Sequence, residues 1–169
     1  MVFSSKNYPQ SMNEIKIRQA TIRDLEKLKE FEQGVIAAER AYDSTLKDQT
    51  QYYNFRVMLE ASNIIVMVAY TETGQIVGSG FARIEKAPEY LVHNKFAYLA
   101  FMYTDPEYRR QGVNDRILGG LTDWSRQQGV KEFRLKVYVG NGIAINAYKK
   151  FGFKDHAIEM RTNVDDWYD

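Results

Sequence analysis

A short stretch at a predicted strand-to-helix junction has the residue types that bind phosphate. Arg109 and Arg110 are followed by Gly112, and a helical pattern begins directly after the glycine. A helix N-terminus carries unpaired backbone N–H groups and a partial positive charge, and a glycine there lets a phosphate approach the backbone. Two guanidinium groups add full charges and forked donors. The stretch therefore predicts a cradle for a diphosphate, and an ordinary surface turn with two solvated arginines is the alternative.

The same stretch differs from the two common nucleotide-binding loops. No Lys followed by Ser or Thr comes after the glycine, as a P-loop requires, and the glycine triplet of the dinucleotide fingerprint is missing. Another glycine pair, Gly78 and Gly80, lies inside a predicted strand and does not lead into a helix. The phosphate prediction therefore depends on the two arginines, Gly112 and the helix.

Composition narrows the class of protein. The chain has 169 residues with 44% hydrophobic residues, which fits one domain with one core. A formal net charge of +1 gives no overall attraction to nucleic acid, so we expect no nucleic-acid partner. The longest apolar stretch, 64–70, is far shorter than the roughly 20 residues of a membrane helix. We therefore expect a cytoplasmic protein with no membrane partner.

The sequence also argues against a metal site. The chain has no Cys, which excludes thiolate catalysis and thiolate metal ligands. Its two histidines, His93 and His156, do not have metal-ligand spacing. We therefore expect no metal.

Hydrophobic periodicity predicts a mixed α/β fold. Strands are expected over 14–19, 64–70, 75–84, 96–104, 133–139 and 153–161, and helices over 22–35, about 46–60, about 112–128 and about 143–150. Thr21 and Asp24 form a cap pair for the first helix. The order β-α-α-β-β-β-α-β-α-β favours a mixed, largely antiparallel twisted sheet with helices on both faces. A single domain is expected over 14–162, after a mobile segment 1–13 and before an acidic tail 163–169.

Two motifs in this chain resemble those of the GNAT family of N-acetyltransferases. The family's main motif, Arg/Gln-x-x-Gly-x-Gly/Ala, is matched by Arg109 and Gly112, whereas Asn114 replaces the last Gly or Ala. Every position of the second family pattern, Asn-x-x-Ala-x-x-x-Tyr-x-x-x-Gly-Phe, is occupied, by Asn141, Ala144, Tyr148, Gly152 and Phe153. The resemblance covers 14–162 in the order of its elements and implies a GNAT-like fold.

The resemblance implies an acetyltransferase, an acyltransferase that uses acetyl-CoA as its cosubstrate. The pantetheine arm would lie along Met102, Tyr103 and Thr104. The pyrophosphate would be bound by the turn residues Arg109, Arg110, Gln111, Gly112, Val113 and Asn114. Asn141 would bind the cofactor or a buried water, or would only cap the following helix. An acceptor amine would attack the thioester directly, without a covalent acyl-enzyme.

The resemblance also gives Tyr148 the role of general acid for the departing thiolate. A phenol with a pKa of about 10 can donate to a stronger base, and a packed helix aromatic is the alternative. Some family members carry a Glu on the strand before the phosphate turn, but 98–103 contains no carboxylate. The other candidates for the general base are Glu39, Asp43, Glu85 and His93, each of which has a solvated surface group as its alternative; a water chain is a further route for the proton.

The acceptor would be a small-molecule amine or a protein amino group. Glu39 and Asp43 would attract a cationic amine, and Tyr98, together with Tyr42 and Tyr90, would wall its pocket. Members of the family often form dimers, so a homodimer is one expectation. A non-catalytic acyl-CoA-binding or regulatory module on the same fold is the alternative function, because Asn114 and the missing strand carboxylate depart from the family pattern.

Overall fold

The computed structural model describes residues 14–167, which divide into two compact units between Lys136 and Val137. The expected mobile segment 1–13 lies outside the described residues. The single domain expected over 14–162 stays a prediction. In the described part of the chain, no helix has the length and apolar character needed to cross a membrane.

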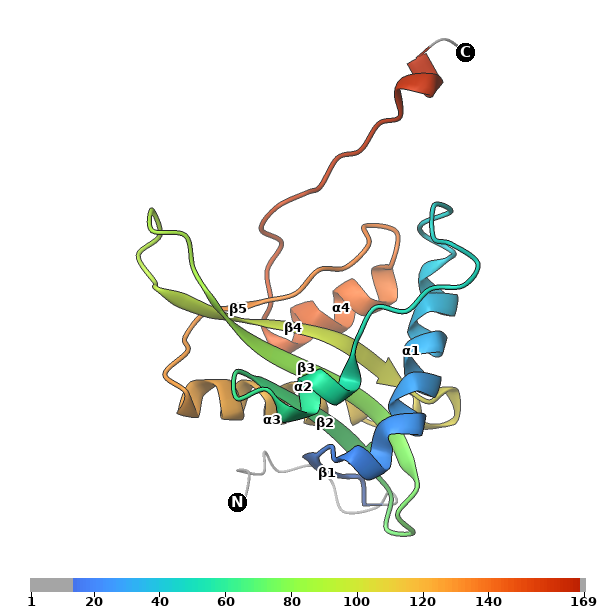
Figure 1. Ribbon diagram of the computed structural model, residues 1–169, viewed down its shortest axis with the longest axis vertical. Coiled ribbons are helices and arrows are strands. Elements are labelled where there is room, and N and C mark those ends of the chain that lie inside the picture. Colours follow the sequence, from blue (N-terminus) through green and yellow to red (C-terminus); the bar gives the residue numbers. More distant parts are fainter. Residues whose placement is uncertain (1–13, 168–169) are drawn as a thin grey trace. The chain divides into compact units, whose positions relative to one another are not determined.

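A five-stranded sheet forms the centre of the first unit (Figure 1). Its strands lie side by side in chain order: β1 (Lys16–Gln19), β2 (Ile64–Tyr70), β3 (Ile76–Lys86), β4 (Lys95–Thr104) and β5 (Phe133–Arg134). The first four strands are antiparallel to their neighbours, and β5 runs parallel to β4. The predicted mixed, largely antiparallel sheet is therefore confirmed.

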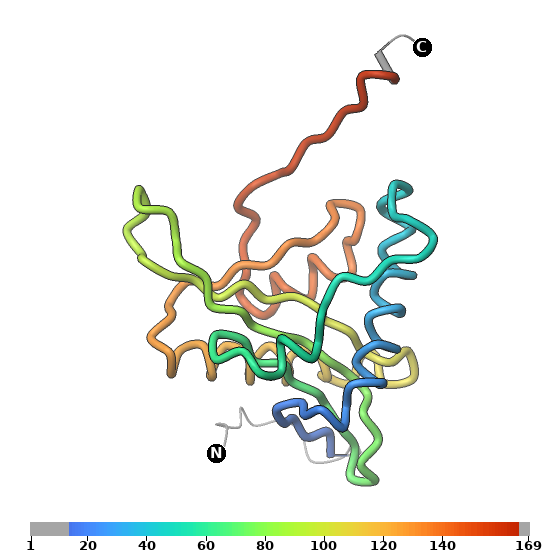
Figure 2. The backbone as a smooth tube through the Cα atoms, viewed as in Figure 1, coloured from blue at the N-terminus to red at the C-terminus, as the bar shows by residue number. Residues whose placement is uncertain are grey.

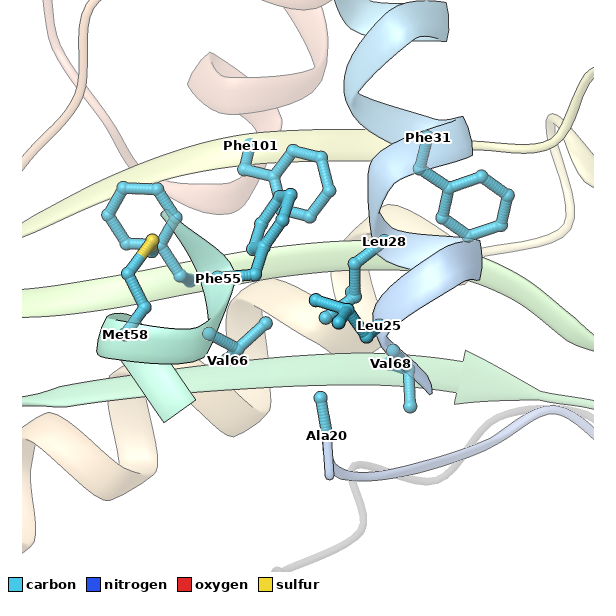
Figure 3. Packing of buried hydrophobic residues seen from close by; sticks show 10 residues of the cluster. Ala20, Leu25, Leu28, Phe31, Phe55, Met58, Val66, Val68 and Phe101 are labelled. Carbon is cyan, nitrogen blue, oxygen red and sulfur yellow. The ribbon is translucent and has the colours of Figure 1, made fainter. Parts of the chain in front are cut away.

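Helices cover both faces of this sheet, as predicted. A 3₁₀ turn (Ile22–Asp24) leads into α1 (Leu25–Glu39), which lies with the short α2 (Phe55–Glu60) on one face. Their apolar side chains meet those of β2, β3 and β4 in a buried cluster (Figure 3). This cluster contains Ala20, Leu25, Leu28, Phe31, Phe55, Met58, Val66, Val68, Phe81 and Phe101. The cluster holds α1 and α2 against the strands.

The opposite face of the sheet carries α3 (Val113–Gln127), which packs unusually close to β3. A Cβ atom at Gly78 would lie 2.6 Å from Cγ1 of Val113, and one at Gly80 would lie 2.8 Å from Cγ2 of Ile117. Real Cβ atoms do not approach so closely, so both positions require glycine for this packing. The pair of strand glycines thus sets the position of α3 and of its N-terminus.

The predicted cap pair before α1 is confirmed. The Thr21 backbone N–H donates to Oδ2 of Asp24 at 2.7 Å, and the Arg18 guanidinium donates to both carboxylate oxygens at 2.7 and 2.8 Å. The hydrogen bond from Arg18 is the largest of the causes that hold the pKa of the buried Asp24 below its ordinary value. Asp24 therefore joins β1 to the start of α1.

The helix predicted over 46–60 is wrong in its first two turns. Only Phe55–Glu60 is helical, and residues 41–54 form a loop without helix or strand. The backbone N–H groups of Tyr52 and Tyr53 donate to the Glu32 side chain instead of to helical carbonyls. A long-range hydrogen bond therefore overrides the local helical pattern.

Of the last two predicted strands, the first is much shorter than predicted and the second does not form. The strand expected over 133–139 is reduced to the two residues of β5, and residues 153–161 form no strand. Among its described residues the second unit contains α4 (Gly142–Phe151) and a 3₁₀ turn (Val164–Trp167). Ile158 and Met160 are 77% and 91% exposed, so the apolar alternation there is not matched by burial on a sheet face.

Candidate active site

Strand β4 has a β-bulge halfway along its length. The register with β3 shifts between Ser79 and Phe81, so Gly80 faces two residues of β4, Phe101 and Met102. Phe101 has a φ of 59°, a left-handed conformation that is rare for a bulky side chain. Such bulges bend a strand and redirect its side chains, and they are common beside active sites.

The bulge changes which side chains of β4 face α1. The Phe101 ring lies in the α1 cluster at 5.0 Å from the Phe55 ring, and the Tyr103 ring lies 4.6 Å from that of Phe31. Gly34 of α1 makes room for Tyr103, because a Cβ there would lie 2.5 Å from its ring. At and after the bulge, the side chains of residues 101 and 103 therefore both face α1.

Past its short pairing with β5, one side of the β4 backbone is without a strand neighbour in the part of the chain that is described. β5 pairs only with Ala97 and Tyr98. The remaining stretch of β4, residues 99–104, contains Met102, Tyr103 and Thr104, which the resemblance assigns to the pantetheine arm. Unpaired N–H and C=O groups along a strand edge can bind an extended ligand as an added strand.

The predicted phosphate turn follows this edge directly (Figure 2). The Asp105 N–H donates to the carbonyl of Val77 at 2.9 Å, and the Asp105 side chain accepts from the Glu107 N–H at 3.1 Å. The Tyr108 hydroxyl donates to Oε1 of Gln75 at 3.1 Å. These contacts anchor the first half of the turn to the start of β3.

The second half of the turn contains two residues with positive φ and leads directly into α3. Arg110 and Gly112 have φ values of 62° and 76°, and α3 begins at the next residue, Val113. No atom lies within 4 Å of a Cβ built on Gly112, so the space above this backbone is open. Arg109 is exposed, and Gln111 donates to the carbonyl of Glu107 at 3.0 Å. The first turn of α3, with Asn114, thus presents backbone N–H groups to an open surface.

A second group of polar residues gathers at the C-terminal end of α1. Glu39 is half-buried, and its Oε2 accepts a hydrogen bond of 2.8 Å from the Tyr52 hydroxyl. Burial raises the pKa of Glu39 above its ordinary value; the bond from Tyr52 opposes this rise, and the charge of Asp43 adds to it. Asp43 itself accepts from the Thr45 backbone N–H at 2.9 Å.

Two further tyrosines connect Glu39 to the bulge. The Tyr53 ring stands edge-on to the Phe101 ring at 5.5 Å. Burial is the main cause that raises the pKa of Tyr53, and the charges of Tyr98 and Glu39 add to it. The pKa of Tyr98 is likewise raised, mainly by burial, while the cation of Arg83 opposes the rise. Tyr53 and Tyr98 both pack against the apolar cluster between α1 and the sheet, and Tyr53 directly follows Tyr52, the hydrogen-bond partner of Glu39, so these groups lie in one part of the molecule.

We call these residues the acceptor cluster: Glu39, Asp43, Tyr52, Tyr53 and Tyr98. The structure thus brings together Glu39, Asp43 and Tyr98, which the sequence singled out. Tyr52 and Tyr53 were missed, although two adjacent tyrosines after an acidic loop are a visible signal. Tyr90 is 85% exposed in the β3–β4 loop, so it walls no pocket in the described residues.

The other candidates for a general base have partners of their own. Glu85 accepts from the Arg83 guanidinium at 2.6 and 2.8 Å. His93 lies 2.9 Å from the Arg134 guanidinium. Within residues 14–167, no group of three or more His, Asp or Glu side chains is arranged to hold a metal ion.

The second family motif lies in the second unit. The Asn141 side chain accepts from the Ala144 N–H at 3.1 Å, so it caps α4, one of the two roles considered for it. The Tyr148 ring is half-buried and packs edge-on to Phe153 at 6.1 Å between centroids. The catalytic role of Tyr148 stays a prediction.

Comparison with known proteins identifies the family to which these features belong. The sequence profile described as the acetyltransferase (GNAT) family matches residues 23–153. Over 58 residues the chain is 36% identical to thialysine N-epsilon-acetyltransferase from Sus scrofa, a match that covers 34% of each chain. The chain therefore spans about a third of the length of this curated relative.

Solved structures show the same fold at low identity. A variant of the BH1408 protein from Bacillus halodurans superposes with a TM-score of 0.79 at 19% identity, over 88% of this chain and 99% of that one. A predicted acetyltransferase with acetyl-CoA from Clostridium acetobutylicum has a TM-score of 0.70 at 17% identity, over 90% and 98% of the two chains. These likenesses concern the fold alone.

Proposed function

The chain belongs to the acetyltransferase (GNAT) family, and on this premise we propose that it transfers an acetyl group from acetyl-CoA to an amine. The observation that carries the proposal is the bulged edge of β4, which has no strand neighbour beyond β5 among residues 14–167 and runs straight into an open, positive-φ turn at the start of α3. A strand edge suits an extended arm with amide groups, and a helix N-terminus suits a pyrophosphate. Both features occur in this order along one segment, 99–113.

This arrangement supports the cofactor-binding residues that the family resemblance implies. The backbone groups of Met102 and Thr104 pair with the amides of the pantetheine arm, with Tyr103 between them. The pyrophosphate is bound by the turn, whose members are Arg109, Arg110, Gln111, Gly112, Val113 and Asn114. The open space at Gly112 supports this role, because a side chain there would occupy the position of the phosphate.

The reaction needs one donor for the departing thiolate and one acceptor for the proton of the amine. The amine gives up its proton to a base, for which Glu39, Asp43 or a water chain are the candidates; its nitrogen attacks the thioester carbonyl, and the bond to sulfur breaks. Tyr148 donates a proton to the departing thiolate, which a phenol with an ordinary pKa of about 10 can do. Asn141 stays at the cap of α4 and holds the start of the helix that carries Tyr148.

The acceptor cluster binds the amine. Glu39 and Asp43 bring negative charge to this part of the molecule, and Tyr98 adds a neutral hydroxyl group. The cluster touches the bulge through Tyr53 and Phe101, so an amine bound there lies beside the edge of β4. The relative from Sus scrofa is named for the acetylation of thialysine, a small-molecule amine, which supports this class of acceptor.

The absence of Cys makes a direct test straightforward, since a thiol-reactive dye reports only released CoA. Purified protein with acetyl-CoA and a panel of primary amines should release CoA with at least one of them. Acetyl-CoA alone should raise the midpoint of thermal unfolding, by about 2.7 kcal/mol of stability at a hundredfold excess over Kd, while ATP and NAD should not. No stabilisation and no CoA release would together contradict the proposal.

A non-catalytic acyl-CoA-binding module is the second candidate function. Asn114 at the last motif position and the lack of a carboxylate on 98–103 favour it. Stabilisation by acetyl-CoA without CoA release for any amine would be the result expected of such a module.

A further inference from the structure

Polar side chains of α1 and of Arg40, the residue directly after it, hold the loop 41–54 against the helix. The Arg40 guanidinium donates to three successive carbonyls, those of Leu46 at 3.1 Å, Lys47 at 2.6 Å and Asp48 at 2.9 Å. Gln33 donates from its side-chain amide to the carbonyl of Thr50 at 3.2 Å. The loop has no helix or strand of its own, so these side chains determine its path.

The last part of the loop is held by a buried carboxylate, Glu32. Its side chain is only 1% exposed, and its Oε1 accepts both the Tyr52 and the Tyr53 backbone N–H, each at 2.8 Å. Burial of a carboxylate is unfavourable unless strong hydrogen bonds compensate for it, and bonds from N–H groups to a charged oxygen are strong ones. A Glu at this position is therefore explained by the two N–H groups that it fixes.

Fixing these two N–H groups sets the directions of two tyrosine side chains. Glu39 follows Glu32 by seven residues, about two helical turns, so both lie on one face of α1. The Tyr52 hydroxyl reaches Glu39 at 2.8 Å, while the Tyr53 ring packs against Phe101 at 5.5 Å between centroids. One buried oxygen thus aligns the acceptor cluster with both Glu39 and the bulge.

We propose that Glu32 is the positioning residue of the acceptor side: it fixes Tyr52 and Tyr53 so that the Glu39 carboxylate is oriented to bind the protonated amine of the acceptor. This inference depends on the proposed function. The phenol of Tyr52 occupies one oxygen of Glu39 and leaves the other for an ammonium group. Glu32 itself is buried and acts only through the loop.

Two substitutions at Glu32 distinguish the effect of its hydrogen bonds from the effect of its volume. Glu32→Gln keeps an oxygen that can accept both N–H groups, whereas Glu32→Leu removes it and keeps a similar volume. Glu32→Leu should raise the KM for the acceptor about tenfold or more and leave the KM for acetyl-CoA within about twofold. Glu32→Gln should restore most of the acceptor affinity, and Tyr52→Phe should reproduce the loss in part.

Leu28→Ala serves as a control for stability. Leu28 is fully buried in α1, but it belongs to the apolar cluster and makes none of the hydrogen bonds that hold the loop 41–54. It should lower the unfolding midpoint and leave both KM values unchanged at a temperature where it is folded. A rise of both KM values in Glu32→Leu, or an unchanged acceptor KM, would overturn the inference.

The inference can fail separately from the proposed function. If the wild-type protein releases no CoA with any amine, the proposed function fails, and binding of 1,6-diaminohexane is then followed by NMR. Shifts of the Tyr52 and Tyr53 amide signals that are lost in Glu32→Leu and kept in Glu32→Gln would still support the positioning role. No shift in the wild-type protein would overturn it.

Discussion

The cofactor side and the acceptor side of the proposed site are built in opposite ways. The cofactor side is one continuous segment, 99–113, whose relevant groups are backbone N–H and C=O groups, an open glycine and two exposed arginines. The acceptor side is made of side chains from α1, the loop 41–54 and β4. Hydrogen bonds over long sequence separations join α1 to the loop, and Tyr98 of β4 packs against the same apolar cluster as Tyr53.

This difference shows which part of the sequence determines the specificity for the cofactor and which part determines the specificity for the acceptor. A backbone site needs only a particular local shape, so a few residues at constant spacing suffice for it. A side-chain site needs distant residues to be brought together, and here a single buried carboxylate, Glu32, does part of that work. We therefore expect changes on the two sides to affect different constants, the affinity for acetyl-CoA on one side and the KM for the acceptor on the other.

The largest effect is expected for a change that should leave both affinities intact. Tyr148→Phe removes the proposed proton donor but keeps the ring that packs on Phe153. The kcat should fall about 100-fold, with both KM values nearly unchanged, as measured by CoA release. Tyr90→Phe, in the β3–β4 loop where Tyr90 is exposed, is the matched control and should keep its kcat. An unchanged rate in Tyr148→Phe would rule out Tyr148 as the acid.

A change at Gly112 tests the cofactor side alone. Gly112 has a φ of 76°, so Gly112→Val is strained and fills the open space above the turn. The affinity for acetyl-CoA, measured by calorimetry, should fall about tenfold or more, equivalent to about 1.4 kcal/mol. Gly119→Ala, in the middle of α3 with no neighbour within 4 Å, is the control and should leave this affinity unchanged. If Gly112→Val lost affinity for the acceptor alone, the assignment of Gly112 to the cofactor side would be contradicted.

A change at Glu39 tests the acceptor side alone. Glu39→Gln keeps an acceptor for the Tyr52 hydroxyl but removes the charge, so the acceptor KM should rise about fivefold to tenfold while the acetyl-CoA constant stays the same. In the wild-type protein, acceptor binding should weaken as the pH falls through the raised pKa of Glu39, and this acid limb should be missing in Glu39→Gln. Steady-state rates at several pH values measure both effects, and an acid limb that persists in the variant would contradict the assignment.

The smallest effect is expected at Asp24, where a change should lower the free energy of unfolding without altering the affinity for acetyl-CoA or for the acceptor. The pKa of Asp24 is lowered, mainly by Arg18, so its ionised form stabilises the fold above the ordinary carboxyl pKa of about 3.9. This contribution, about 1 kcal/mol after allowance for the partly exposed Arg18, is lost as the pH falls through the lowered pKa. Urea unfolding should therefore show Asp24→Asn less stable than wild type at pH 7 and nearly equal to it in strong acid. A difference that is the same at both pH values would contradict this origin.

The sequence predicted the parts whose structure depends on neighbouring residues. Gly112 was recognised because a glycine between arginines and a helical pattern has a local meaning, and the structure gives it the positive φ that only glycine adopts easily. The cap pair of Thr21 and Asp24 was likewise found from a spacing of three residues. In both places the relevant partners lie within one turn of the chain.

The tertiary structure alone decided the parts that depend on distant partners. The strongly aromatic and apolar run 96–104 gives no sign of the bulge at Phe101, which arises from the pairing with β3. The pattern of 46–60 resembles a helix, but Glu32, twenty residues before Tyr52, captures the N–H groups that a helix would use. Local periodicity thus identified β1 to β4 and the helices α1, α3 and α4, but not the extent of the last strands. The acceptor cluster formed only on folding, because a buried carboxylate satisfies its hydrogen bonds with whichever backbone the fold brings to it.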